Sequence, residues 1–289
     1  MLFRSALTSL RRALKPPTPL RLVAPLALAL CAAGCPDNNG ADPPTDQLFF
    51  PIAAALHRAT AGAPADLLYV VNANFDLRYN GSTVAALDLG ALRRRLVDHQ
   101  GCAPDETERG AWVCDDRPLV RAAATKKINP YAVDAALARY PGGQRLYVLV
   151  RGGNTMTWFD VGEDGSLDCG ATDERGYCSA EHSAGGDPAQ SGTNVRLPAD
   201  PSSISVDESR GQIVVTHQSF DANAPRASFF YDPSAAVASA GQRSGPWLVN
   251  VVAGLPSGLS ALALLPRASN DARSTWFVTS RSDASFTTL

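Results

Sequence analysis

The residues whose types and spacing most directly suggest chemistry in this 289-residue chain are four cysteines in two close pairs. They are Cys102, Cys114, Cys169 and Cys178. Each pair lies in a polar insertion, residues 100–117 or 164–192, which has few apolar residues to form a core of its own. An even number of cysteines in an exported chain predicts disulfides, with three possible connectivities. Local pairing is favoured because each pair lies inside such an insertion. Each bridge would close a loop of about 10 residues and contribute about 2–3 kcal/mol. Neither a Cys-x-x-Cys motif nor a nearby pair of histidines supports a zinc site instead.

A nucleophilic hydrolase would need a serine or cysteine beside a histidine and an acid. The sequence has no Gly-x-Ser-x-Gly motif. The histidines are His57, His99, His182 and His217. None has a partner that is visible from sequence spacing, so the prediction is that no residue is catalytic and that the histidines serve in packing or lie on the surface.

A divalent metal would need hard oxygen ligands that converge from several segments. The candidates follow strand-like segments and are Asn72, Asn74, Asp76, Asn154 and Asp221. Asn and Asp at such positions commonly cap loops. The sequence therefore predicts no metal site and no cofactor, and a divalent metal stays the alternative.

The start of the chain has the composition of a targeting segment. Residues 1–34 contain five cations and no acid, and residues 22–34 form an apolar stretch of 13 residues. That stretch is shorter than the roughly 20 residues needed to cross a bilayer, but it suits the core of a secretory signal. Residues 1–34 are therefore predicted to be a signal peptide, and the protein to be exported.

Ala32-Ala-Gly-Cys35 resembles the bacterial lipobox, although Ala32 stands where leucine is usual. The resemblance implies that Cys35 is lipidated and becomes the mature N-terminus; an ordinary signal peptide is the alternative. Residues 35–47 are hydrophilic and are predicted to be a flexible tether. By resemblance to lipoproteins of bacteria with two membranes, Pro36 in place of aspartate favours the outer membrane.

The secondary-structure elements that must position these residues are predicted from a sequence pattern that occurs four times. The copies begin at Pro51, Pro130, Pro201 and Pro256. Each has apolar runs of four to six residues, rich in Val, Ile, Leu and aromatics and separated by turn residues such as Asn80-Gly81, which is a strand pattern. A unit that recurs at tens of residues indicates stacked or radial repeats.

A fourth strand in each of the first three copies is predicted at residues 119–123, 193–197 and 247–252. Four antiparallel strands in each unit describe a propeller blade. Residues 86–97 also show helical periodicity, and the prediction there is a strand to about Leu89 followed by a short helix.

The order of these segments, with residues 160–168 as the most typical passage, resembles the YVTN or lactonase-type β-propeller repeat over residues 48–289. The resemblance implies an all-β fold, a partial β-propeller of about three and a half four-stranded blades that is open rather than closed. The fourth copy stops at Leu289, inside its third predicted strand, so the expectation is a truncated propeller or one that another chain completes. Such propellers serve as enzymes, binders and scaffolds alike.

The net charge of the chain limits the classes of partner that it is expected to bind. The chain has a formal net charge of −2, and without residues 1–34 it has 21 basic and 28 acidic residues, a net charge of −7. An acidic domain gives no electrostatic reason to bind nucleic acid. The expectation is a lipid-anchored cell-envelope propeller that acts as a binding or assembly module, with the membrane and an envelope protein or glycan as partners. The alternative is a lactonase-like hydrolase with a divalent metal in its channel.

Overall fold

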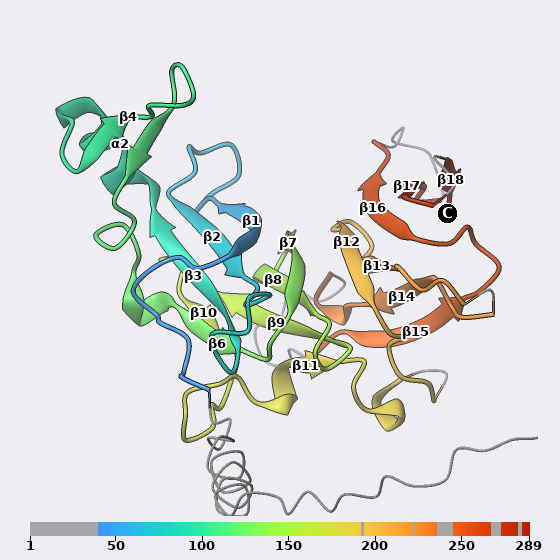
Figure 1. The fold of residues 1–289 in the computed structure, drawn as a ribbon. Helices are drawn as coiled ribbons and strands as arrows, with labels where there is room; N and C mark the ends of the chain where they lie inside the picture. The colour runs from blue at the N-terminus through green and yellow to red at the C-terminus, as the bar shows by residue number, and fades with distance from the viewer. Residues whose placement is uncertain (1–39, 192–193, 222, 236–244, 267–272, 283–284) are drawn as a thin grey trace, which may run out of the picture. The chain divides into compact units, whose positions relative to one another are not determined.

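The computed structural model describes residues 40–191, 194–221, 223–235, 245–266, 273–282 and 285–289. Residues 41–289 form one compact unit. In it, four antiparallel sheets follow one another along the chain and make an open, four-bladed β-propeller (Figure 1). The predicted fold class is confirmed, including a fourth sheet of only three strands. The predicted signal peptide and Cys35 lie outside the described residues.

Each blade is formed by one continuous stretch of the chain. Blade one contains β1 (Pro51–His57), β2 (Leu67–Asn72), β3 (Ser82–Asp88) and β6 (Lys126–Ile128). Blade two contains β7 (Ala132–Tyr140), β8 (Gly143–Val150) and β9 (Thr155–Val161), with β10 (Leu167–Asp168) and β11 (Ser183–Ala184) both paired to β9. Blade three contains β12 (Pro201–Asp207), β13 (Gln212–His217), β14 (Ala227–Tyr231) and β15 (Trp247–Val252). Blade four contains β16 (Leu259–Leu264), β17 (Trp276–Ser280) and β18 (Phe286–Thr288).

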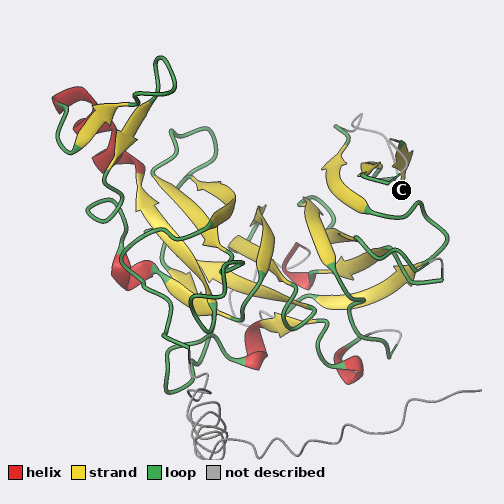
Figure 2. Ribbon diagram, in the orientation of Figure 1, coloured by secondary structure: helices red, strands yellow, loops and turns green. Residues whose placement is uncertain are grey.

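The helical segments lie in the connections between strands (Figure 2). They are α2 (Leu89–Asp98), η1 (Ala122–Ala124), η2 (Ala180–His182), η3 (Pro188–Gln190) and η4 (Pro233–Ala235). The strand-to-helix change predicted near Leu89 is confirmed. It occurs there because the Asp88 side chain caps α2, accepting a hydrogen bond from the backbone N–H of Ala91 at 2.8 Å.

The first strands of successive blades contact one another, β1 with β7, β7 with β12 and β12 with β16. Apolar side chains of the following strands fill the space between the sheets. The core shared by blades one and two includes Tyr69, Ile128, Leu146 and Phe159. The core shared by blades two and three includes Leu149, Trp158, Ile213 and Phe230. Because no blade buries both of its faces alone, adjacent blades stabilise each other through this shared apolar surface.

A buried ion pair also joins blades two and three. Arg145 on β8 is 2 % exposed, and its Nη1 donates to both carboxylate oxygens of Asp232, which is fully buried, at 2.9 and 2.8 Å. Its Nε donates to Asp160 on β9 at 2.9 Å, and its guanidinium lies 4.3 Å from the ring centre of Trp158. Because both Arg145 and Asp232 are buried, removal of either partner would leave the other charge uncompensated in the interior.

Two of the three predicted fourth strands are wrong. Residues 119–123 contribute only an isolated bridge between Leu87 and Val120, and the fourth strand of blade one is β6. In blade two the described residues 194–197 contain no strand, and β11 pairs with β9 instead. Both true strands have two or three residues and little apolar character, so they carry no hydrophobic run. The prediction at residues 247–252 is confirmed by β15.

Each first strand begins with the same backbone turn. The residue before the strand has a positive φ, between 48° and 64°, and the four are Phe50, Tyr131, Asp200 and Gly258. Their carbonyl oxygens accept hydrogen bonds of 2.9–3.1 Å from the backbone N–H groups of Ala73, Arg151, Gln218 and Arg281. These donors all follow the second strand of a blade directly. The repeat is therefore reproduced at the level of single hydrogen bonds.

One residue further into each first strand, a β-bulge shifts the register. The extra residues are Ile52, Val133, Ser202 and Ser260. This alignment shows that the four prolines are not equivalent. Pro51 and Pro201 begin their strands, whereas Pro130 and Pro256 lie earlier, in the turns that precede β7 and β16.

The last part of the predicted tether is held against blade one. Ala41 forms an isolated bridge with Tyr79, and Asp42 pairs with Lys127 at 3.1 Å and with Arg175. Gln47 accepts hydrogen bonds from the Arg117 guanidinium at 2.7 and 3.0 Å. Residues 41–47 are thus part of the compact unit.

Candidate binding site at the axial pocket

The bulges of three blades line a single cavity of about 230 Å³. It forms because the first strands lie side by side, so that their bulged ends converge. The lining residues are Ile52, Phe75, Val133, Arg151, Pro201, Ser202, Gln218 and Arg281. Three are bulged residues, and three more directly follow a second strand. We call this cavity the axial pocket.

One wall of the axial pocket is apolar and comes from blades one and two. Ile52 is 46 % exposed, and Val133 lies at the equivalent position on β7. The Phe75 ring is fixed behind them by two aromatic contacts, with Phe50 at 5.8 Å and Tyr131 at 5.9 Å between ring centres. These two partners are the positive-φ residues of blades one and two. The wall offers an apolar surface to the non-polar part of a ligand.

The other wall is polar and carries positive charge. Arg151 forms an ion pair of 2.8 Å with Asp200, and both side chains are partly exposed to solvent. That contact uses one of the five N–H donors of the guanidinium. Arg281 is exposed, and within the described part of the chain no carboxylate forms an ion pair with it. Two guanidinium groups against one carboxylate suit a carboxylate, sulfate or phosphate group.

Two further polar side chains complete this wall, and they have different roles. The Ser202 hydroxyl donates to the backbone carbonyl of Leu259 at 2.8 Å, which joins blade three to the first strand of blade four. The half-buried Gln218 amide lies between the positions of the two arginines in the repeat and can donate to a ligand. The pocket thus combines an apolar surface with two cationic side chains and one amide donor.

The candidate metal ligands do not line the axial pocket. The Asn72 side chain is buried and spans Phe49 N and Thr83 Oγ1, at 3.1 and 2.8 Å. The other side chains make local loop contacts: Asn74 with the backbone of Tyr79, Asp76 with Arg78, and Asp221 with Asn223 N. Asn154 has a positive φ of 47° in the turn before β9. In the residues that the structure describes, no group of three or more His, Cys, Asp or Glu side chains could hold a metal ion.

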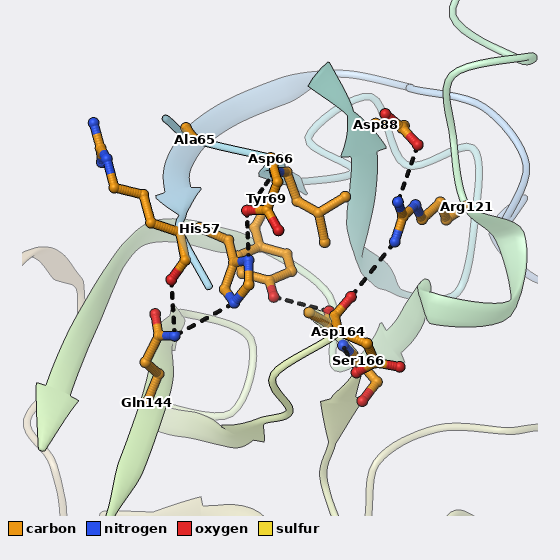
Figure 3. Close-up of polar contacts among 12 residues, drawn as sticks. His57, Ala65, Asp66, Tyr69, Asp88, Arg121, Gln144, Asp164 and Ser166 are labelled. Carbon is orange, nitrogen blue, oxygen red and sulfur yellow. Dashed lines mark hydrogen bonds and ion pairs between the residues drawn. The ribbon is translucent and has the colours of Figure 1, made fainter. Parts of the chain in front are cut away.

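His57 has an acidic partner that the sequence analysis missed. Its Nδ1 lies 2.8 Å from Asp66 Oδ1, and its Nε2 lies 3.4 Å from the Gln144 amide nitrogen on blade two (Figure 3). His57 ends β1 and Asp66 precedes β2, so the hairpin between these strands is the signal that could have revealed the pair. His57 is 0 % exposed. The histidine is therefore enclosed at the junction of the two blades, while the Asp66 side chain is 45 % exposed.

The same junction contains other contacts between blades one and two. The Tyr69 hydroxyl donates to the Gly165 carbonyl at 2.8 Å, and burial raises the pKa of Tyr69, so it stays a neutral donor. Arg121 contacts Asp88 at 3.0 Å and the Asp164 carbonyl at 3.5 Å (Figure 3). These contacts attach the loop after β9 to blade one, so we assign the junction to inter-blade cohesion.

The remaining histidines pack as the sequence predicts. His99 stacks on Trp112 and His182 on Trp158, with 4.7 and 3.6 Å between ring centres. His217 is fully buried, and this burial lowers its pKa from 6.5 to about 4.

The cysteines form the two local disulfides, Cys102–Cys114 and Cys169–Cys178. The first joins β4 (Cys102–Pro104) to β5 (Trp112–Cys114), a two-stranded ribbon separate from the blades. The second closes the loop between β10 and β11. Both insertions are thus cross-linked where they lack an apolar core of their own. The search for spanning segments, limited to the residues described, finds no helix that is long and apolar enough to cross a membrane.

The sequence matches no protein-family profile and no curated protein. Among solved structures it is similar to a functionally unknown protein from Desulfotomaculum acetoxidans DSM 771, with 10 % identity, a TM-score of 0.44, and coverage of 83 % of this chain and 55 % of the other. It is also similar to Kuenenia stuttgartiensis hydrazine synthase, with 13 % identity, a TM-score of 0.39, and coverage of 83 % and 53 %. The chain spans about half the length of these structures. Similarities at this level carry no inference about function.

Proposed function

We propose that this chain is a lipid-anchored propeller of the bacterial cell envelope that binds a small organic anion in its axial pocket, without catalysis of its own. The observation that carries the binding proposal is the presence of two guanidinium groups, Arg151 and Arg281, in one cavity with an apolar wall. They come from equivalent positions of blades two and four. The net charge of the predicted mature chain is negative, so this cationic wall contrasts with the molecule as a whole.

The lining of the cavity favours a ligand with two chemically distinct ends. A carboxylate or similar group would accept charge-assisted hydrogen bonds from the arginines. An aromatic or aliphatic body would displace water from Ile52, Phe75 and Val133. A cation of the same shape would be repelled by the arginines, and a fully polar anion would leave the apolar wall uncovered.

Calorimetric titration of the purified protein with benzoate, hexanoate and benzylamine tests the pocket. We expect the two acids to bind and the amine not to bind. Because hydrogen bonds to charged groups contribute about 1.5–3 kcal/mol, Arg281→Gln and Arg151→Gln should each weaken acid binding by about ten-fold or more. Arg78→Gln is the matched control, since Arg78 is 73 % exposed, pairs with Asp76 and does not line the pocket. Equal binding of the amine, or unchanged binding by Arg281→Gln, would contradict the proposal.

The envelope location rests on the sequence. The signal-like residues 1–34 and the lipobox-like residues before Cys35 support lipidation at Cys35, and Pro36 favours the outer membrane. The order of the apolar segments in the sequence, with residues 160–168 as the most typical passage, supports assignment of the blades to the YVTN-type repeat. Labelling of cells with a radioactive fatty acid should mark the wild-type protein but not Cys35→Ser. Equal labelling of both proteins would refute the anchor and leave the binding proposal untouched.

A further inference from the structure

A second and larger cavity, of about 590 Å³, lies beside the outer strands of blades one and two. Its lining residues come from the end of β6, from β9, from the loop closed by Cys169–Cys178 and from the segment after β11. Its polar side chains include Asn129, Thr155, Thr157, Asp173, Ser179 and Asp187. We call it the lateral pocket. The loop that the sequence marks as an insertion is therefore one of its walls.

Within the part of the chain that the structure describes, two hydroxyl groups in the lateral pocket have no hydrogen-bond partner. Thr155 is 7 % exposed, and neither its Oγ1 nor the buried Ser179 Oγ contacts a donor or acceptor. Burial of a hydroxyl without a hydrogen-bond partner lowers the stability of the fold, so such a group is expected to bond to a water or a ligand atom. Two glycines leave the space around Thr155 open: a Cβ on Gly186 would lie 3.1 Å from Thr155 Cγ2, and one on Gly153 would lie 3.4 Å from Oγ1.

Two carboxylates give the pocket further acceptors. One oxygen of Asp173 accepts from the backbone N–H groups of Arg175 and Tyr177, and one oxygen of Asp187 accepts from Ala189 N, all at 2.9 Å. These bonds orient each carboxylate and involve only Oδ1. The second oxygen can accept from the hydroxyl groups of a ligand.

The charge and the donor set together select the chemistry of the ligand. The lining residues include two aspartates and no lysine or arginine, which disfavours an anion. Arg175 interacts electrostatically with Asp173 and offsets part of the negative potential, which weakens the case for a cation. Carboxylate, amide and hydroxyl side chains match the adjacent hydroxyl groups of a sugar ring, and Ile128 and Ala180 beside them suit its C–H face.

We infer that the lateral pocket is a second binding site, for a neutral carbohydrate, in which Thr155 and Ser179 hydrogen-bond to ring hydroxyls and Asp173 and Asp187 accept from them. The Cys169–Cys178 disulfide holds the wall that carries Asp173. This site is independent of the axial pocket, with which it shares no lining residue.

Calorimetric titration of the full chain with glucose, N-acetylglucosamine and maltose tests the inference, with spermidine as the cationic comparison. At least one sugar should bind. Thr155→Val should lower the affinity for that sugar by about ten-fold, because one hydrogen bond in the pocket is lost. Thr155→Val is nearly isosteric and removes an unpartnered hydroxyl, so its melting temperature should be unchanged or higher. Ser179→Ala should also lower the affinity for the same sugar. Thr60→Val removes an exposed hydroxyl from the turn after β1 and should bind as the wild type does.

The inference is overturned if none of the three sugars binds, if spermidine binds and the sugars do not, or if Thr155→Val binds sugar as tightly as the wild type. Arg281→Gln separates the two sites: it should leave sugar binding unchanged while it weakens benzoate binding. Sugar binding that depends on Arg281 would place the sugar in the axial pocket and would also overturn the inference.

Discussion

The burial of His217 in blade three provides a quantitative test of the fold, because it links stability to pH. It ends β13, is 0 % exposed, and has its two ring nitrogens 3.0 Å from the Ala199 carbonyl and 2.8 Å from Ser228 Oγ. The carbonyl can only accept, so Nδ1 carries the proton and Nε2 accepts from the Ser228 hydroxyl. Burial disfavours a second proton and lowers the pKa of His217 from 6.5 to about 4.

The magnitude follows from the difference between these two values. At about 1.4 kcal/mol for each pH unit, the gap between 6.5 and about 4 corresponds to about 3 kcal/mol of folding free energy. The folded-state pKa is the lower one, so the unfolded chain takes up the proton first as pH falls. The contribution is therefore fully present above pH 6.5 and is lost between pH 6.5 and about 4. A domain stable by about 5–15 kcal/mol would lose a substantial part of its stability in this range.

Urea unfolding at pH 7 and at about pH 4.5 measures the effect. Between these conditions the wild type should lose about 2–3 kcal/mol more than His217→Gln, since glutamine does not titrate. His99→Gln, which alters an exposed histidine, should follow the wild type. An equal loss in wild type and His217→Gln would refute the reasoning, because it would mean that His217 is protonated equally easily in the folded and the unfolded chain.

Three further perturbations test the inter-blade contacts and the second insertion. Burial raises the pKa of Asp134 above 3.8, so the ionised form is disfavoured in the folded state and stability falls as pH rises through that raised value. In urea unfolding, the free energy of unfolding of Asp134→Asn relative to that of the wild type should therefore increase between about pH 3.5 and 7. Asp232→Ala leaves the guanidinium of Arg145 buried without its buried carboxylate partner and should lower the free energy of unfolding by about 3–5 kcal/mol, with recovery when Arg145→Met is added. An unchanged urea midpoint would contradict this. Replacing Cys169 and Cys178 together by serine should lower the free energy of unfolding by about 2–3 kcal/mol and weaken sugar binding. Unchanged stability and unchanged sugar affinity would show that the bridge has no role in the lateral pocket.

The sequence was sufficient for most of the fold because its signals are local. The second strands, such as Leu67–Asn72 and Gln212–His217, are buried runs of β-branched and aromatic residues between turns, and such runs specify strands without tertiary information. The two disulfides join near neighbours in sequence, and Asp88 begins α2 through a side-chain cap. The outer strands β6 and β11 were missed because pairing with β3 and β9 defines them, and their short, mostly polar sequences carry no such signal.

The axial pocket was missed for a different reason. Arg151 and Arg281 are far apart in sequence, and each is an ordinary polar residue after a strand. Alignment of the copies by their prolines gave the wrong register, because two of the prolines lie before the turn rather than in the strand. Alignment by the ends of the second strands would have placed Ala73, Arg151, Gln218 and Arg281 at one position of the repeat. That position is the signal that predicts a shared polar wall.

The strain in the repeated turn also bears on function. A positive φ is open to glycine, as at Gly258, but costs other residues about 1–2 kcal/mol. Blades one to three nevertheless have Phe50, Tyr131 and Asp200 there. Each of these side chains supports the axial pocket: the two aromatic rings hold Phe75, and the carboxylate pairs with Arg151. Glycine would relieve the strain in all three blades and would remove these supports, so the non-glycine residues serve the pocket better than they serve stability.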